Sequence, residues 1–306
     1  ALLLGAVLAS TDPAAIIPVL KRLRFKKISV KDLVVSESAV TDVTGTLLTL
    51  AFLAILLGTG AISTVMGGYS ALFTAETGML LIKEILFGIV FGVIGYGLLK
   101  VLTRFAKQSG EESDVEAAYF LFVPIIIFAG AVAFGGSGYL AAFIAGLLFM
   151  LEKHLHHTER FFNHTIEGFL KPTIFILLGA LVEIQSLIEY AGIGIVAALI
   201  FMFIIRPIAV IIALGPFSFF GKKKDRFSFK EILFVSFVRE TGAIPAVLLV
   251  TIVSMGIPGL DGFVPIGMWI ILATLIIEPP LTPWVAKKLG VATAIEDDHS
   301  LVIHSK

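Results

Sequence analysis

The sequence predicts an all-α polytopic membrane protein. Of its 306 residues, 58% are hydrophobic and 15% are charged, and the mean hydropathy is +1.01. Soluble domains are about 45–50% apolar and about 25% charged, so this composition lies outside their class. Long apolar runs also recur along the chain, with short polar segments between them. These observations exclude nucleic-acid-binding domains and cytosolic enzymes, and the absence of cysteine excludes disulfide scaffolds and thiolate sites.

Nine apolar runs approach the length of a membrane-spanning helix, which needs about 20 residues to cross a bilayer core. We expect the helices at about 1–20, 33–57, 80–103, 116–134, 138–151, 166–184, 191–214, 231–254 and 264–285. The fifth run is short. Together they predict one transmembrane domain at 1–285, followed by a short polar cytoplasmic tail at 286–306.

The basic residues predict how these spans are oriented. Most of the 23 Lys and Arg residues follow the odd-numbered spans, and the opposite connections contain none. Because Lys and Arg are enriched in cytoplasmic loops, we expect the basic connections and the C-terminus to face the cytoplasm. Ala1 already lies within an apolar run and would begin outside the cell. We therefore interpret the sequence as the C-terminal portion of a multi-pass protein of the cell membrane, with upstream helices missing.

Two predicted spans are interrupted by charged residues and proline. The first contains Asp12 before Pro13, and the eighth contains Arg239 and Glu240 shortly before Pro245. Proline removes a backbone donor, so we expect both helices to open within the membrane and to free backbone carbonyls. Paired discontinuous helices are the best sequence indication of an ion site in a transporter. Ordinary proline kinks are the alternative, and the charges at both breaks disfavour it.

The second span begins with a cluster of carboxyl and hydroxyl side chains. Ser38 and Asp42 are four residues apart and share one helix face, and Glu37 and Thr41 form a second such pair on the adjoining face. Carboxylate, hydroxyl and carbonyl oxygens together suit a hard monovalent cation, whereas zinc prefers histidine or cysteine. The alternative is that Glu37 and Asp42 only cap the helix start in cytoplasmic water.

Two arginines lie deep in later spans, Arg206 in the seventh and Arg239 in the eighth. A charge at the bilayer centre costs at least about 2.5–3.5 kcal/mol. Each of these arginines therefore needs a partner, water or a functional role.

At these positions the sequence resembles the sodium/proton exchangers of the first monovalent cation:proton antiporter family. The matching pieces recur in the family's order and are Thr11-Asp12-Pro13, Glu37-Ser38 with Asp42-Val43-Thr44-Gly45, Arg206-Pro207, and Arg239 with Gly242-Ala243-Ile244-Pro245. The resemblance implies an inverted-repeat antiporter fold with two crossing discontinuous helices, and a homodimer. It also implies thirteen helices in the whole protein, so that about four precede this sequence.

The resemblance further implies roles for individual residues. Asp42 would bind either the cation or the proton, and Ser38 and the backbone of Thr11 would help to ligate the cation. Asp12 would offset the helix-end dipoles at the crossing. Glu37 would pair with an arginine of a later helix, with Arg206 as the first choice and Arg239 as the second.

Two positions depart from the family pattern. Thr41 stands where the family usually has asparagine, and a single hydroxyl offers fewer hydrogen bonds than an amide. Glu240 follows Arg239 where the family commonly has glycine. We expect Glu240 to neutralise Arg239 locally, and an additional protonatable site is the alternative.

The predicted function is exchange of a monovalent cation for H⁺ by alternating access, most simply electroneutral because one carboxylate, Asp42, titrates. Na⁺ is the first choice of cation, and K⁺ and Li⁺ are the alternatives. We expect no cofactor other than the transported ions, and as partners only the cations, protons, the lipid bilayer and a second copy of the chain, with no nucleic acid. A sodium-coupled solute symporter of related fold is the main alternative, ahead of a cation channel and an intramembrane aspartyl protease.

Overall fold

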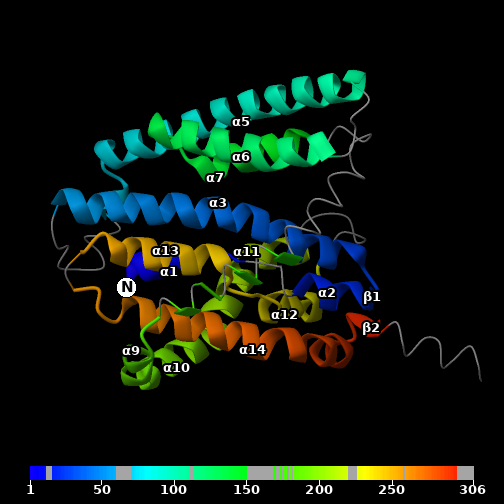
Figure 1. Cartoon of the computed structure of the whole chain (residues 1–306). Helices are drawn as coiled ribbons and strands as arrows, with labels where there is room; N and C mark the ends of the chain where they lie inside the picture. Colours follow the sequence, from blue (N-terminus) through cyan, green and yellow to red (C-terminus); the bar gives the residue numbers. More distant parts are fainter. Residues whose placement is uncertain are drawn as a thin grey trace, which may run out of the picture. The chain divides into compact units, whose positions relative to one another are not determined.

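The computed structural model describes most of the chain as α-helix (Figure 1). The described residues are 1–11, 16–59, 70–109, 114–149, 182–219, 226–257 and 259–294, together with the pairs 168–169, 172–173, 176–177 and 179–180. Eight of the nine predicted spans fall on these residues, and each of the eight contains helix. The sixth predicted span, 166–184, is described only in part, with eight of its 19 residues outside the described set, and Asp12 also lies outside it.

The chain divides into two compact units. Unit 1 comprises Ala1–Val7 and Asp42–Phe175, and unit 2 comprises Leu8–Thr41 and Ile176–Lys306. Helix α3 (Ile28–Thr59) contributes to both, because the boundary falls between Thr41 and Asp42.

Unit 1 contains the short helix α1 (Leu2–Val7) and three packed helices. These are α5 (Ala75–Ser109), α6 (Asp114–Ala133) and α7 (Gly138–Phe149), which lie side by side in Figure 1. Their shared core is formed by Leu99, Val123, Ile127, Ala145 and Phe149.

Glycines on α5 allow α7 to approach closely. A Cβ atom at Gly92 would lie 2.6 Å from the Ile144 side chain and 2.9 Å from the Ala141 carbonyl oxygen. One turn earlier, a Cβ at Gly88 would lie 2.9 Å from Leu140. Small residues at such spacing let membrane helices pack backbone to backbone.

Unit 2 contains the remaining helices and a two-stranded sheet. In chain order its elements are α2 (Ile16–Lys21), β1 (Leu23–Phe25), the first part of α3, α9 (Ile184–Glu189), α10 (Ala191–Ile200), the π-helical segment η2 (Phe201–Ile205), α11 (Arg206–Phe219), α12 (Phe229–Phe237), α13 (Ala243–Ser254), α14 (Phe263–Leu289) and β2 (Ala292–Ala294).

Helix α14 continues beyond residue 285, the predicted end of the transmembrane domain, to Leu289. It stops at Gly290, whose φ of 69° is the left-handed conformation common at helix C-termini. The chain then forms β2, which pairs antiparallel with β1 so that Phe25 lies opposite Ala292 and Leu23 opposite Ala294. The first residues of the predicted tail are therefore packed into unit 2.

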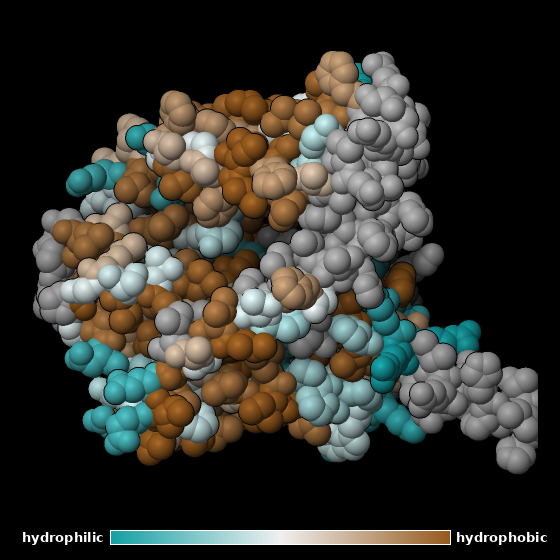
Figure 2. All heavy atoms as spheres, viewed as in Figure 1, coloured by the Kyte–Doolittle hydropathy of each residue, from teal (hydrophilic) through white to brown (hydrophobic). Residues whose placement is uncertain are grey.

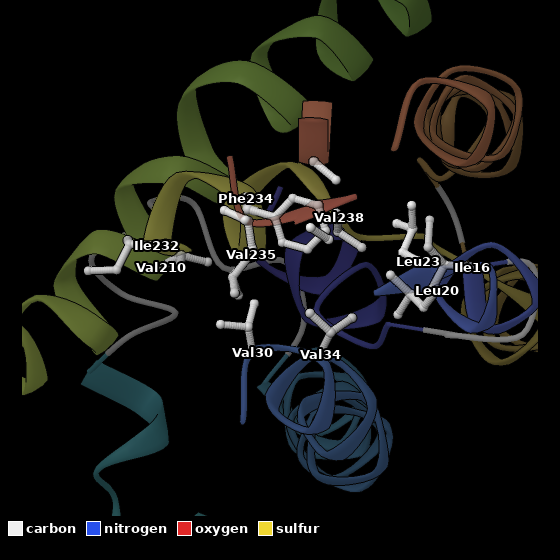
Figure 3. Packing of buried hydrophobic residues seen from close by; sticks show 13 residues of the cluster. Ile16, Leu20, Leu23, Val30, Val34, Val210, Ile232, Phe234, Val235 and Val238 are labelled. Atoms are coloured by element: carbon white, nitrogen blue, oxygen red, sulfur yellow. The ribbon is translucent and has the colours of Figure 1, made fainter. Parts of the chain in front are cut away.

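A hydrophobic cluster supports this end of unit 2. Figure 3 shows side chains from α2, α3 and α12 turned toward a common interior. Phe234 is fully buried there and meets the ring of Phe25 edge-on, with 5.8 Å between the ring centroids. The buried members of the cluster are Ile16, Leu20, Leu23, Val30, Val34, Val210, Ile232, Phe234, Val235, Val238, Ala286, Val291 and Ala292.

Large apolar side chains cover the outer faces of the helices. Ile82, Leu86 and Val93 on α5 are each at least half exposed. In the visible face of Figure 2, hydrophobic residues dominate over the helices, and hydrophilic residues gather near β1 and β2. Four helical stretches are long and apolar enough to cross a membrane among the described residues: Ile28–Leu57, Ala75–Phe105, Ala191–Phe219 and Phe263–Leu289. An exposed apolar surface of this extent is typical of contact with lipid.

Candidate ion-binding site

Both predicted breaks are present in the structure. In the first span, α1 ends at Val7, the described residues 8–11 are not helical, and α2 comprises Ile16–Lys21. In the eighth, α12 ends at Phe237 and α13 begins at Ala243, with the non-helical segment Val238–Gly242 between them. Pro245 lies in the first turn of α13, where its missing N–H needs no helical acceptor. Each of these two spans is therefore a pair of shorter helices.

Arg239 links the two breaks within unit 2. Its guanidinium Nη2 donates to the carbonyl oxygens of Leu8 at 2.5 Å, Ala9 at 3.0 Å and Ser10 at 3.4 Å. The ring of Phe201 lies below the guanidinium, 4.8 Å from its carbon. Carbonyls at the end of a helix lack intrahelical donors and carry partial negative charge. The arginine of the second break thus satisfies carbonyls freed by the first.

Glu37 pairs with Arg206. The Nη1–Oε1 distance is 2.5 Å and the Nη2–Oε2 distance is 2.8 Å, so the two side chains form a bidentate ion pair. Arg206 is the first residue of α11 and directly follows the π-helical segment η2, a distortion that is frequent at functional sites. Two charge-assisted hydrogen bonds make this one of the stronger polar contacts a buried arginine can form.

Thr11, Ser38 and Thr41 join the first break to α3. The Ser38 hydroxyl donates to the Thr11 carbonyl at 2.5 Å, and the Thr11 N–H donates to Thr41 Oγ1 at 3.3 Å. The two threonine hydroxyl oxygens lie 2.7 Å apart, and Thr41 Oγ1 donates to the Ser38 carbonyl at 3.1 Å. Because a hydroxyl has one proton, Thr11 is the donor when Thr41 bonds to Ser38. Thr41 therefore orients the Thr11 backbone beside Ser38.

These groups line a small pocket in unit 2 with an empty volume of about 220 Å³. Glu240, which is 2% exposed, contributes to its wall. The lining residues are Thr11, Ile16, Val34, Glu37, Ser38, Arg206, Val238, Arg239 and Glu240.

Of the remaining predicted site residues, Asp42 belongs to unit 1 and Asp12 lies outside the described residues. Helix α3 places Asp42 directly after Thr41 and one turn beyond Ser38. The Asp42 carbonyl accepts the Thr46 hydroxyl at 2.7 Å, as in an undisturbed helix. The described residues contain no group of three His, Cys, Asp or Glu side chains that could hold a metal ion.

The sequence model of the family described as "Sodium/hydrogen exchanger, transmembrane" matches residues 1–288. The chain belongs to the sodium/hydrogen exchanger family. The family description is that of a transmembrane exchanger and the relatives are antiporters, so the predictions of an all-α polytopic membrane fold and of a protein that is not an enzyme are confirmed.

Two antiporters resemble the chain over most of its length. The K⁺/H⁺ antiporter NhaP2 of Shewanella oneidensis is 28% identical over 283 residues, which cover 90% of this chain and 45% of the relative. The Na⁺/H⁺ antiporter 1 of Methanocaldococcus jannaschii is 27% identical over 261 residues, covering 82% and 55%. The chain thus spans about half the length of these relatives.

A solved structure of the family shares the fold. The sodium proton antiporter MjNhaP1 from Methanocaldococcus jannaschii at pH 8 superimposes with a TM-score of 0.66 and 25% sequence identity, covering 94% of this chain and 70% of that one. The interrupted spans described above therefore occur within an exchanger fold.

Sequence reasoning missed two buried acidic residues of this exchanger chain. Glu278 on α14 is 3% exposed, and Glu84 on α5 is 8% exposed. Both lie inside predicted spans, at 264–285 and 80–103. The criterion that selected Glu37 and Glu240, a carboxylate within an apolar run, applies equally to them. Glu278 also precedes two prolines, Pro279 and Pro280.

Proposed function

We propose that the protein containing this chain exchanges a monovalent cation, Na⁺ or K⁺, for H⁺ across the membrane. The observation that carries the proposal is the hydrogen-bonded contact of Ser38 with the Thr11 carbonyl, at the first break and one helical turn before Asp42. It places the Ser38 hydroxyl against the Thr11 carbonyl, and Asp42 follows Ser38 on the same helix. The names of the relatives support exchange over symport, and they include both K⁺ and Na⁺ antiporters.

In the proposed mechanism, Asp42 binds either the cation or a proton. Ser38 and the backbone of Thr11 provide further oxygen ligands, and Asp12 offsets the helix ends. Partial burial favours the protonated carboxyl and a bound cation favours the carboxylate, so that one ligand displaces the other. Outward-facing and inward-facing states then exchange, biased only by the difference in ligand affinity between them.

The charged residues around this site stabilise its structure in the proposal. The Glu37–Arg206 pair fixes α3 against α11, and Arg239 fixes the first break against the second. Glu240 offsets the charge of Arg239 in this proposal. One titrating carboxylate then gives one cation per proton and no net charge movement.

We further propose that the protein is a homodimer in the cell membrane, with its basic loops and C-terminus in the cytoplasm. The transmembrane domain at 1–285 and the tail at 286–306 belong to the same proposal. The clustering of Lys and Arg in alternate connections supports the orientation. Cross-linking of the purified full-length protein in lipid would reveal a dimer, and a monomer alone would contradict this part.

Transport by the full-length protein in proteoliposomes tests the function. An imposed pH gradient should collapse when Na⁺ or K⁺ is added, and Asp42→Asn should abolish the effect. Asp32→Asn is the matched control, because Asp32 lies on the same helix at an exposed position. Proton flux that ignores every alkali cation would refute exchange. A membrane current during exchange would refute electroneutrality.

A further inference from the structure

The second break leaves backbone N–H groups without helical partners, because the chain from Val238 to Gly242 is not helical. Helix α14 supplies acceptors for two of them. The Arg239 N–H donates to Glu278 Oε2 at 3.1 Å, in addition to a local contact with the Phe237 carbonyl at 3.0 Å. The Thr241 N–H donates to Thr274 Oγ1 at 3.2 Å. Buried N–H groups without an acceptor are costly, so these side chains stabilise the non-helical segment.

The two acceptors belong to a polar stripe on an otherwise apolar helix. Thr274, Glu278 and Thr282 are four residues apart and therefore share one face of α14, and they are 0%, 3% and 0% exposed. Thr274 donates its proton to the Ile271 carbonyl at 2.9 Å, which leaves its oxygen free to accept from Thr241. Thr282 donates to the Glu278 carbonyl of its own helix at 2.7 Å. Two members of the stripe thus reach the break, and the third does not.

These hydrogen bonds fix the position of the Arg239 backbone, from which its side chain extends. The backbone of Arg239 is held by Glu278, and its guanidinium is held by the carbonyls of Leu8, Ala9 and Ser10. Those carbonyls directly precede Thr11, whose own carbonyl accepts from Ser38. A displaced second break would therefore move a positive charge relative to the proposed cation ligands.

We propose that Thr274 and Glu278 are positioning residues for ion exchange: they anchor the second break through its backbone and so set the place of Arg239 beside the first break. The inference rests on the proposed function, and it adds residues of α14 that touch neither the cation nor the proton. Displacing Arg239 changes the field at the cation ligands, so we expect the apparent cation KM to change more than the maximal rate.

Matched threonine variants of the full-length protein test the role of Thr274. Thr274→Val removes the acceptor, Thr274→Ser keeps it, and Thr282→Val makes the same change at an equally buried position that does not contact the break. Hydrogen–deuterium exchange of a peptide covering residues 238–242 reports anchoring without any need for transport. Proteoliposome assays report KM and maximal rate.

We expect Thr274→Val to speed amide exchange in this peptide by about fivefold, the effect of losing one hydrogen bond, and to raise the cation KM by a similar factor. Thr274→Ser and Thr282→Val should leave both quantities within about twofold of wild type. Unchanged amide exchange in Thr274→Val would overturn the inference, and so would an equal rise of KM in Thr282→Val.

Glu278 is tested by Glu278→Gln, which keeps an oxygen acceptor, and Glu278→Leu, which removes it. Anchoring predicts faster amide exchange and a raised KM in the leucine variant only. If the glutamine variant behaves like the leucine variant, the effect depends on the charge of Glu278 and not on its hydrogen bond to Arg239. That result would refute a positioning role for Glu278. Wild-type protein without cation-driven proton flux would refute the proposed function, whereas the amide-exchange comparison would still decide whether α14 anchors the break.

Discussion

Arg206 and Glu37 are separated by 169 residues in the sequence and meet through two hydrogen bonds, at 2.5 and 2.8 Å. Arg206 is 7% exposed, so its charge depends on this carboxylate for compensation. The pair fastens α11 to the part of α3 that also carries Ser38.

Removing one partner of this pair should destabilise the protein. Glu37→Gln leaves a buried guanidinium without a counter-charge, which typically costs about 3–5 kcal/mol. Arg206→Gln should act similarly, and the double variant should lose less than the sum of the two. Unfolding of the purified protein in detergent, analysed as a double-mutant cycle, measures the coupling. Additive effects would show that the two side chains do not depend on each other.

Replacement of Arg239 should slow exchange, and loss of its charge should slow exchange further than loss of its planar fork alone. Arg239→Gln uncaps the carbonyls of Leu8, Ala9 and Ser10, and Arg239→Lys keeps the charge but lacks the planar fork. We expect the glutamine variant to lose at least about tenfold in exchange rate, equivalent to 1.4 kcal/mol, and the lysine variant to be intermediate. Arg104→Gln, at an exposed position of α5, is the control. Wild-type rates in Arg239→Gln would refute a role for this contact.

The hydroxyl of Ser38 should determine cation affinity. Ser38→Ala removes a proposed ligand and the hydrogen bond to the Thr11 carbonyl, and a lost contact to charge is worth about 1.5–3 kcal/mol, so the cation KM should rise at least about tenfold. Ser36 lies two residues earlier on α3 and donates only to carbonyls of its own helix, those of Asp32 and Leu33. Ser36→Ala should therefore keep the wild-type KM. Equal effects in the two alanine variants would contradict a ligand role for Ser38.

Competition at Asp42 predicts the pH dependence of exchange. Protons and cations bind the same carboxylate in the proposal, so lowering the pH raises the proton-bound fraction and weakens cation binding. The apparent cation KM should rise by up to about tenfold for each pH unit below the pKa of the site and should level off above it. Initial rates over a range of pH and cation concentration measure this. A KM that is constant across pH would exclude direct competition.

The sequence predicts the spans and the breaks because hydropathy and proline act locally. Long apolar runs predict the helices α3, α5 and α14, and the prolines predict both interruptions. The partner of Arg239 was not predictable in the same way. Two arginines and Glu37 all lie in or beside apolar runs, and only tertiary packing decides that Arg206 meets the carboxylate while Arg239 meets backbone carbonyls. Glu278 also lies in an apolar run, but no charged neighbour marks it as Arg239 marks Glu240.

Short elements also escaped prediction. The strands β1 and β2 have three residues each, which is too few to show an alternating apolar pattern. They are also far apart in the sequence, near its two ends. The π-helical segment before Arg206 has no signal in an apolar run such as Phe201–Ile205. Thr274 gave no signal either, because a single threonine is common in membrane helices.

Helix packing in unit 1 gives a prediction that is independent of the ion site. Gly92→Ala places a methyl group 2.6 Å from Ile144 and 2.9 Å from a backbone oxygen, so α5 and α7 must separate. We expect a loss of about 1–3 kcal/mol, as for overpacked cores. Gly97→Ala meets no atom within 4 Å and should be neutral or slightly stabilising. Thermal unfolding in detergent compares the two, and equal stability would refute close packing at Gly92.

The pairing of β1 with β2 connects two distant helices of unit 2. It joins the chain just after α2, the second half of the first broken span, to the chain just after α14. The strand pairing therefore ties the end of α2 to the end of α14, and we expect a displacement of one helix there to pull on the other. Because α14 also binds the second break through Thr274 and Glu278, we expect a shift of α2 to be felt at the second break as well.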